Sequence, residues 1–221
     1  TLEAPRLDPL ADLEKGVQGL RFGRIAEEAL VAMTPEVRDG FEASLRLLEE
    51  AGATVVTVAP PRPFLEIQTA ATHIISSDAY ATHAALADDP EAPLNATTRM
   101  RILVGKPLTA RDRVLAQRRR AADIAEVAAM MDGLDALVMP TAPITARPLS
   151  EADEDDYAMS LYTRFANYHD LCALAVPSGL TPGGLPLSLS IVARRFHDPL
   201  ALRIGRAFEI ARGPFPTPPA A

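Results

Sequence analysis

Apolar and polar residues follow two different periods along the chain, and these periods predict its strands and helices. In residues 185–192 the leucines and the isoleucine share one side at a period of two, opposite Ser188 and Ser190. Residues 54–58 are rich in β-branched side chains, which favour strands. By these signals we expect strands at 20–25, 54–58, 136–139, 172–176 and 185–192.

Helices are predicted where apolar residues recur every three to four positions between start and stop signals. Thr34 and Pro35 are typical of an N-cap and a first helical position, and Gly52 is a typical stop. Thr109 and Asp112 resemble a capping box, with Asp in place of Glu or Gln. The inward face of the helix that they open is predicted to carry Val114, Ala121, Ile124, Ala128 and Met131. Helices are expected at 35–51, 64–87, 95–104, 109–131 and 198–212.

The order of these elements predicts an α/β fold with a mixed, largely parallel sheet flanked by helices. Strand 20–25, helix 35–51 and strand 54–58 form a βαβ unit, whose strands are expected to be parallel with a right-handed crossover. The last two strand candidates are separated by a loop dense in Gly and Pro, which suits a hairpin-like pair.

Three segments are predicted along the chain. Residues 1–17 are a polar lead-in from an upstream segment, 18–212 form the folded part, and 213–221 are a mobile Pro-rich tail. Residues 151–156 are expected to be a solvated acidic loop. The chain begins at Thr1 and its first methionine is Met33, so we expect it to be part of a longer polypeptide.

Composition narrows the class of protein. The chain has 221 residues, 48% of them hydrophobic, which is enough for a sizeable core. The net charge of −7 argues against a nucleic-acid partner, because such partners need a basic surface. One cysteine excludes an internal disulfide, and no apolar run reaches the roughly 18 residues of a membrane span. With no secretory signal, we expect a cytoplasmic protein without a membrane partner.

Self-contained catalytic or metal chemistry has little support in the sequence. The chain holds no G-x-S-x-G motif. His169 and Cys172 are three residues apart and could meet on one helical face, but Cys172 lies in an apolar run and is better explained as a buried thiol. The four histidines have no pair spaced for a metal on a helix, so no metal is predicted: His73, His83, His169 and His197.

Five arginines cluster in a short stretch of the sequence: Arg111, Arg113, Arg118, Arg119 and Arg120. Because these arginines fall on a helix with an apolar stripe, a solvated helix face explains them better than nucleic-acid binding.

Four motifs in order resemble the C-terminal half of the amidase signature family of amide hydrolases. Residues 135–143 resemble the family pattern D-x-L-x-x-P-T-x-P. Thr163 and Asn167, then A-L-A-V-P at 173–177 and G-L-P at 184–186, follow in the family's order. The spacing from Ser76–His83 through Arg101 to Arg118–Arg120 also fits. The resemblance covers about residues 18–212 and implies the family's α/β fold.

The resemblance implies hydrolysis of the C–N bond of a small amide by a serine nucleophile, a bridging serine and a lysine base. In the family, these serines lie in a Gly- and Ser-rich stretch N-terminal to the half seen here. The only lysines of this chain are Lys15 and Lys106, its only Gly-Gly pair is 183–184, and no glycines flank Ser76-Ser77. We therefore expect that this chain carries no catalytic residue, needs no cofactor and is inactive alone.

Substrate contacts are the role that the resemblance leaves to this chain. Arg101 matches an arginine that holds a substrate carboxylate in some members, although it could instead brace its helix. Thr163 and Asn167 lie in a segment that faces the pocket in this family. Asp170, where the family usually has Gly, could contact an amine or amide N–H of the substrate, or pair with a nearby arginine. Further departures lie in the presumed pocket wall at Cys172, Ser188 and Ser190.

Two other functions stay open at this point. One is a non-catalytic structural or binding subunit that assembles with a separate partner. The other is an amidotransferase A-type subunit, which belongs to the same family. In each case half of a sheet leaves apolar faces uncovered, so we expect the chain to associate with itself or with an N-terminal half of the enzyme.

Overall fold

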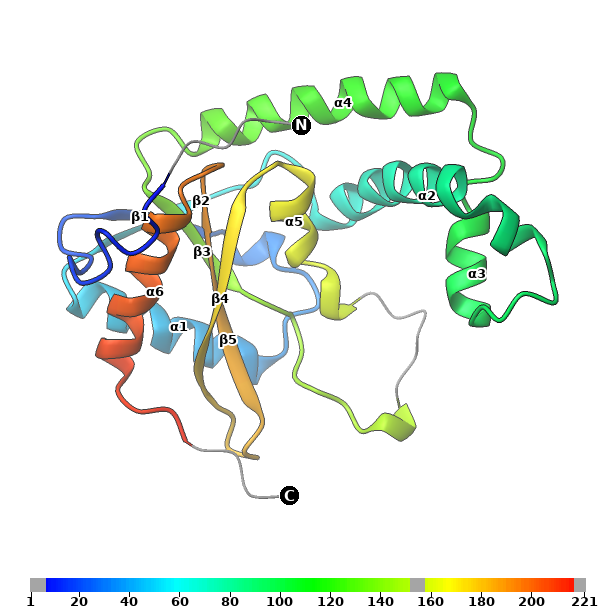
Figure 1. Cartoon of the computed structure of the whole chain (residues 1–221). Coiled ribbons are helices and arrows are strands. Elements are labelled where there is room, and N and C mark those ends of the chain that lie inside the picture. Colours follow the sequence, from blue (N-terminus) through cyan, green and yellow to red (C-terminus); the bar gives the residue numbers. More distant parts are fainter. Residues whose placement is uncertain (1–6, 152–157, 217–221) are drawn as a thin grey trace.

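A mixed five-stranded sheet forms the centre of the fold (Figure 1). The structure is a computed structural model that describes residues 7–151 and 158–216. Its strands follow the order β2-β1-β3-β5-β4 across the sheet. They span Arg21–Ile25 (β1), Thr54–Val58 (β2), Ala136–Pro140 (β3), Cys172–Leu180 (β4) and Pro186–Ala193 (β5).

The α/β class and the mixed sheet are confirmed, but the sheet is not largely parallel, because two of the four strand pairs in the described residues are antiparallel. β1 pairs in parallel with β2, in the register Arg21 to Thr54, and in parallel with β3. β5 is antiparallel to both β3 and β4. Parallel pairing therefore occupies the β2-β1-β3 side of the sheet, and antiparallel pairing begins where β5 joins β3. The predicted βαβ unit is confirmed, because helix α1 connects β1 to β2.

The five predicted helices lie close to their predicted positions, whereas the short helix α5 was not predicted. They span Pro35–Glu50 (α1), Phe64–Asp88 (α2), Ala96–Leu103 (α3), Ala110–Met130 (α4), Thr163–Tyr168 (α5) and Asp198–Arg212 (α6). The capping box at the start of α4 is confirmed, since Thr109 and Asp112 bond reciprocally. α2 is kinked at His83, whose φ and ψ are not helical. None of the helices in the described ranges is long and apolar enough to cross a membrane.

One face of the sheet is covered by α1 and α6. Leu174 and Val176 of β4 lie against Gly205 of α6, where a Cβ would collide with Leu174. The hairpin end of β5 reaches α1 in the same way, since Leu187 fills the space beside Gly40. At both contacts the helix backbone approaches a leucine side chain directly, so a Cβ at either glycine would displace the end of that side chain. They fix the two helices against the antiparallel side of the sheet.

The opposite face carries Leu137, Met139 and Val192, all of them buried. These residues share one core with an aromatic cluster from the start of α2 and from α5. In this cluster Phe64 stacks on Tyr162 and Phe165, with ring centroids 5.2 and 5.6 Å apart. The cluster anchors α2 and α5 to each other and to the sheet.

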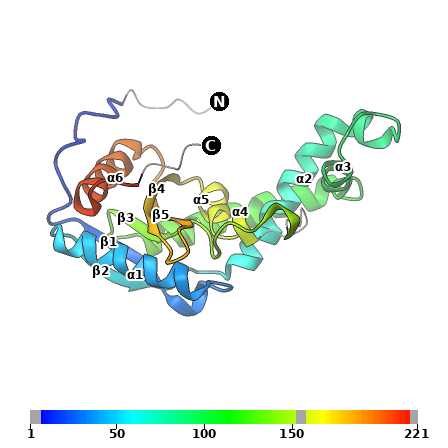
Figure 2. The same cartoon turned by 90° about the horizontal axis from the view of Figure 1, so that it is seen from below.

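The far half of α2, α3 and the first half of α4 extend away from the sheet as a helical arm (Figures 1 and 2). The inward face predicted for α4 is largely wrong: Val114 is 49% exposed, and Ala121 and Ala128 are exposed as well. Of the predicted residues only Met131 is buried, and the side of α4 that packs inward instead carries Asp123 and Val127. Only the C-terminal half of α4 meets the core. In the arm, Arg113 pairs with Asp78 of α2 at 3.0 Å instead.

Part of the predicted lead-in packs on the fold. Val17 is buried, and Arg203 and Arg206 of α6 bond the carbonyl of Gly16 and the carboxylate of Glu14 at 2.6 and 3.0 Å. Three parts of the predicted segments lie outside the described residues: residues 1–6 of the lead-in, most of the acidic loop and residues 217–221 of the tail.

We predict that Gly105→Ala destabilises the protein. A Cβ at Gly105, just after α3, would collide with the carbonyl oxygen of Ser76 in α2, and backbone atoms cannot move aside. Overpacking of this kind lowers the free energy of unfolding by about 1–3 kcal/mol, measurable as a drop in Tm.

Gly183→Ala is the matched control, because a Cβ there would make only an ordinary contact with Thr181 in an exposed turn. Its Tm is expected to stay close to that of the wild type. Equal stability of the two variants would contradict the close packing of α2 on α3.

Candidate functional site

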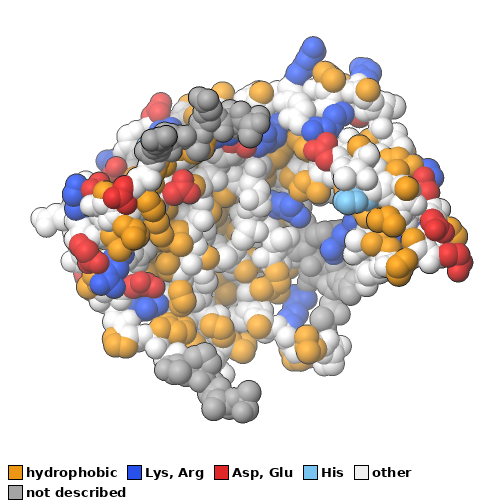
Figure 3. Space-filling model, viewed as in Figure 1, with side chains coloured by type: hydrophobic (Ala, Val, Ile, Leu, Met, Phe, Trp, Pro, Cys, Tyr) orange, Lys and Arg blue, Asp and Glu red, His pale blue; other side chains and the backbone are white. Residues whose placement is uncertain are grey.

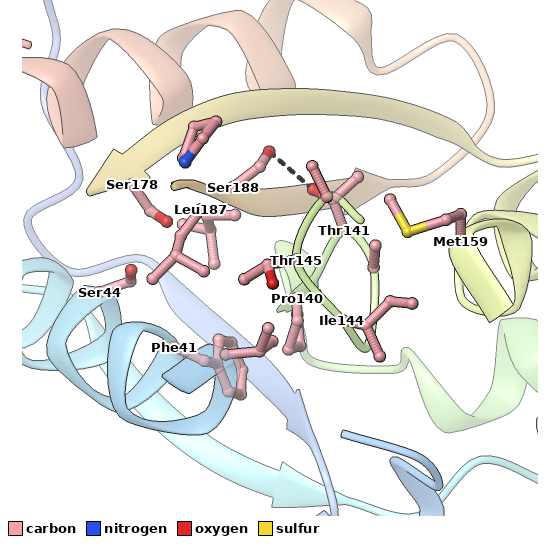
Figure 4. A pocket seen from close by; sticks show the side chains of 15 residues that line it. Phe41, Ser44, Pro140, Thr141, Ile144, Thr145, Met159, Ser178, Leu187 and Ser188 are labelled. Carbon is pink, nitrogen blue, oxygen red and sulfur yellow. Dashed lines mark hydrogen bonds between the residues drawn. The ribbon is translucent and has the colours of Figure 1, made fainter. Parts of the chain in front are cut away.

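An apolar pocket lies at the carboxyl end of β3, where parallel pairing gives way to antiparallel pairing (Figure 4). Its volume is about 250 Å³. In open α/β sheets ligands bind at the carboxyl ends of the strands, which makes this position a candidate site. Three segments line it: α1, the loop after β3 and the β4–β5 hairpin.

Two of the sequence motifs meet at this pocket. The backbone N–H of Thr141 donates to the carbonyl of Ser188 at 3.1 Å, and the two hydroxyls lie 2.8 Å apart. Thr141 belongs to the D-x-L-x-x-P-T-x-P motif, and Ser188 follows G-L-P. Residues 47 positions apart in sequence are thus joined at the rim of the pocket.

A second hollow separates the sheet from the helical arm (Figure 3). This groove has a volume of about 530 Å³. One side of α2 forms the wall of the groove and contributes Gln68, Thr72 and His73. Val104 and Leu161 also line the groove. Val104 follows α3 and Leu161 precedes α5, so the groove borders both segments that were predicted to contact substrate.

None of the four predicted substrate-binding residues lines this groove, and Asp170 lines a different hollow beside Arg194 and Arg195. Arg101 is exposed on α3, at the outer end of the arm. Thr163 and Asn167 are exposed on the same side of α5, one helical turn apart, and the Thr163 hydroxyl donates to the carbonyl of Ser160 at 3.1 Å. α3 and α5 lie apart in both views, so the chain brings Thr163 and Asn167 together but not Arg101 with them (Figures 1 and 2). Their contact with substrate stays a prediction.

Asp170, the fourth predicted residue, pairs with arginines. Its carboxylate accepts a hydrogen bond from Arg120 of α4 and lies 3.7 Å from Arg195. Its backbone is left-handed, with φ of 56°. Asp tolerates this conformation better than most residues, and Gly adopts it freely. This explains why Asp stands where the family usually has Gly.

A buried carboxylate that the sequence did not single out connects the helices next to the groove. Asp123 of α4 is 2% exposed and accepts hydrogen bonds from Arg62 at 2.6 Å, Arg119 at 3.0 Å and the Tyr168 hydroxyl at 2.9 Å. Burial and the Asp123 hydrogen bond raise the pKa of Tyr168 to about 12. The sequence contained one signal for this cluster, because Asp123 and Arg119 are spaced i, i+4 on a helix and can form an ion pair.

The candidate base and nucleophile groups Lys106, His169 and Cys172 do not have the surroundings that those roles require. The hydrogen bond with Asp88 raises the pKa of Lys106, which is the wrong direction for a lysine base. His169 caps α5 and Cys172 begins β4, so they do not share a helical face. Burial raises the pKa of the Cys172 thiol, as expected of an inert cysteine. Burial lowers the pKa of His169, whose Nδ1 lies 2.8 Å from the Phe165 carbonyl.

The basic cluster on α4 makes structural contacts. Arg113 pairs with Asp78, Arg119 with Asp123 and Arg120 with Asp170, while Arg111 and Arg118 are exposed. No group of three His, Cys, Asp or Glu side chains suited to a metal occurs in ranges 7–151 and 158–216.

Sequence comparison identifies the family. The profile of the family described as Amidase matches residues 4–202, and the chain therefore belongs to this family. The predicted resemblance to amidase signature enzymes is confirmed.

Individual relatives agree with this assignment. The chain is 32% identical over 233 residues to the A subunit of glutamyl-tRNA(Gln) amidotransferase from Myxococcus xanthus, covering 94% of this chain and 48% of the relative. A crystal structure of the same protein from Thermotoga maritima superposes with a TM-score of 0.69 at 29% identity, covering 93% of this chain and 45% of the other. An allophanate hydrolase structure from Kluyveromyces lactis gives a TM-score of 0.80 at 25% identity, covering 96% and 34%. The chain spans about half the length of the curated relatives that it matches.

We predict that Asp123→Ala destabilises the protein. The change removes the acceptor of the buried Tyr168 hydroxyl and one acceptor of Arg62. Arg62 keeps its ion-pair contacts with Glu126 at 3.6 Å and Glu66 at 3.9 Å, so the main loss is the unpaired buried hydroxyl of Tyr168. Leaving a buried polar group unpaired lowers the free energy of unfolding by about 1–3 kcal/mol, which urea denaturation measures.

Asp132→Ala is the control for this variant. Asp132 also pairs with an arginine, Arg194 at 3.2 Å, but its side chain is 81% exposed. Its loss is expected to change stability by less than about 1 kcal/mol. Similar losses in both variants would show that burial at Asp123 has no special effect.

Proposed function

We propose that this chain forms one half of an amidase, which hydrolyses the C–N bond of a small amide with a Ser-Ser-Lys triad located on polypeptide outside this chain. The observation that carries the proposal is the outer face of β4. Ala173 and Ala175 are exposed on this face. Their strand pairs with β5, which begins at the proline of the family motif G-L-P. On the other side of β4, Val176 is buried against α6.

The edge of β4 adds to this argument. Within the described residues β4 pairs only with β5, so its second edge has no strand beside it. Natural proteins protect long edge strands with charges, prolines or a covering segment, because an open edge can pair with another chain. The exposed side chains of β4 are uncharged and apolar: Ala173, Ala175, Pro177 and Leu180. Pro177 and the shifted register between Pro177 and Gly179 protect only the hairpin end of this edge, so the part that carries Ala173 and Ala175 suits a covered surface better than an edge in water.

The chemistry of the proposed reaction also requires further residues. Serine needs an adjacent base, and a lysine base needs a lowered pKa. Lys15 pairs with Asp12 at 2.7 Å on the surface, and Lys106 is held in its charged form by Asp88. We therefore propose that the chain alone is inactive, and that it supplies the pocket wall and an anchor such as Arg101.

An amidotransferase A-type subunit is the second candidate function. It is favoured by the names of the Myxococcus xanthus and Thermotoga maritima relatives, each the A subunit of a glutamyl-tRNA(Gln) amidotransferase. The third candidate, a non-catalytic binding subunit, uses the same uncovered face of β4 with a separate partner. A requirement for charged tRNA and partner subunits would favour the amidotransferase over the amidase.

We predict that no serine of the isolated chain reacts with a fluorophosphonate probe. Such probes label serines that a neighbouring base has activated, and no serine in the described residues has a lysine partner. Intact-mass analysis after labelling measures the result, and ammonia release from benzamide and propionamide measures turnover.

A full-length amidase treated in parallel serves as the positive control. If the chain is labelled, or if it releases ammonia and Ser76→Ala abolishes the release, the proposal of an external triad is wrong.

We also predict that the isolated chain associates through the outer face of β4. Ala175→Lys places a charge on this face and is expected to shift the sedimenting species from a dimer toward the 23.7 kDa monomer. Ala81→Lys, on the exposed surface of the arm, is the matched control and is expected to leave the dimer intact.

Sedimentation velocity gives the distribution for all three chains. A wild-type chain that sediments as a clean monomer, or a dimer that only Ala81→Lys dissociates, would contradict a covered β4 face.

A further inference from the structure

Among the described residues that line the apolar pocket between α1 and the β4–β5 hairpin, none carries a charged side chain. Phe41 and Ile144 face Leu187 across the hollow, with Met159 at one side (Figure 4). Phe41 and Leu189 are buried, while Met159 is 50% exposed and forms part of the mouth. The surface offered to an occupant is therefore almost entirely hydrocarbon, with a flexible thioether at its entrance.

The polar groups of the lining fall into two sets. Ser44 donates to the Gly40 carbonyl at 2.7 Å, and Thr141 and Ser188 bond each other, so these hydroxyls need no ligand. The hydroxyls of Thr145 and Ser178 have no hydrogen-bond partner in the part of the chain that the structure describes. Both point into the same hollow (Figure 4). They can hold one carbonyl or amide N–H each.

Size and charge limit what the pocket can take. Its volume of about 250 Å³ exceeds the roughly 150 Å³ of an apolar cavity that holds benzene. A charged group would lose its hydration without gaining an opposite charge, because Arg24 beside Phe41 is already paired with Glu42.

We propose that this pocket binds the apolar substituent of a small uncharged amide, about the size of a phenyl ring or a short branched alkyl chain. The substituent packs against Phe41, Ile144 and Leu187, and the amide group meets the hydroxyls of Thr145 and Ser178. This proposal rests on the proposed function only in naming an amide as the ligand. It implies selection against charged substrates such as free amino acids.

Binding of benzamide to the isolated chain tests the proposal. Saturation-transfer NMR titrations are expected to detect benzamide, and to show benzoate, of the same shape but negatively charged, binding at least about tenfold more weakly. Met159→Trp fills the mouth and is expected to weaken benzamide binding about tenfold, with its Tm recorded to confirm folding. Leu65→Trp adds the same side chain to the other groove, where Leu65 is 58% exposed, and is expected to leave binding unchanged.

Three results would overturn the proposal: no benzamide binding, equal binding of benzoate, or a loss of binding in Leu65→Trp but not in Met159→Trp. These results are separate from the failure of the proposed function. A chain that binds benzamide in this pocket and also reacts with the fluorophosphonate probe would retain the pocket assignment and reject the external triad.

Discussion

The arrangement of α2, α4 and α5 beside the sheet depends on one buried carboxylate. Asp123 receives donors from the segment before α2, from its own helix and from α5, so three parts of the chain converge on a single side chain. A carboxylate withdrawn from water is tolerated only when its oxygens are hydrogen-bonded. This requirement fixes the position of α5 relative to the first turn of α2. It therefore also fixes the wall of the groove between the sheet and the arm. Arg120, one turn before Asp123, ties the same helix to Asp170.

The position of the two hollows follows from this framework. The groove lies where α2 leaves the sheet, and the pocket lies where β5 reverses the direction of pairing. The groove offers amide, hydroxyl and imidazole groups along one stripe of α2, whereas the pocket is hydrocarbon with two unpaired hydroxyls. Half of an enzyme with this distribution would bind the polar part and the apolar part of a substrate at separate walls. The proposed external triad would act on a substrate lying within reach of these walls.

Local sequence signals predicted the elements well, because each depends on residues close together in the chain. Thr109 and Asp112 located the start of α4, and alternation located β5. The inward face of α4 was wrong because periodicity cannot tell that half of a helix leaves the core. The Asp123 cluster was missed for a similar reason, since Arg62 and Tyr168 lie 61 and 45 residues away from it. Motif order indicated the family, but no spacing rule revealed that α1 would close a pocket against Leu187.

The left-handed backbone at residue 170 has a consequence for how the family can vary. Glycine suits this conformation without help, so an aspartate here persists only where its carboxylate has partners, and Arg120 and Arg195 provide them. The three positions therefore form a coupled set. Without Arg120 the aspartate would keep its left-handed backbone but lose its hydrogen bond, whereas glycine would adopt the same torsion with no partner. A single backbone torsion thus restricts which substitutions can accumulate fifty residues away.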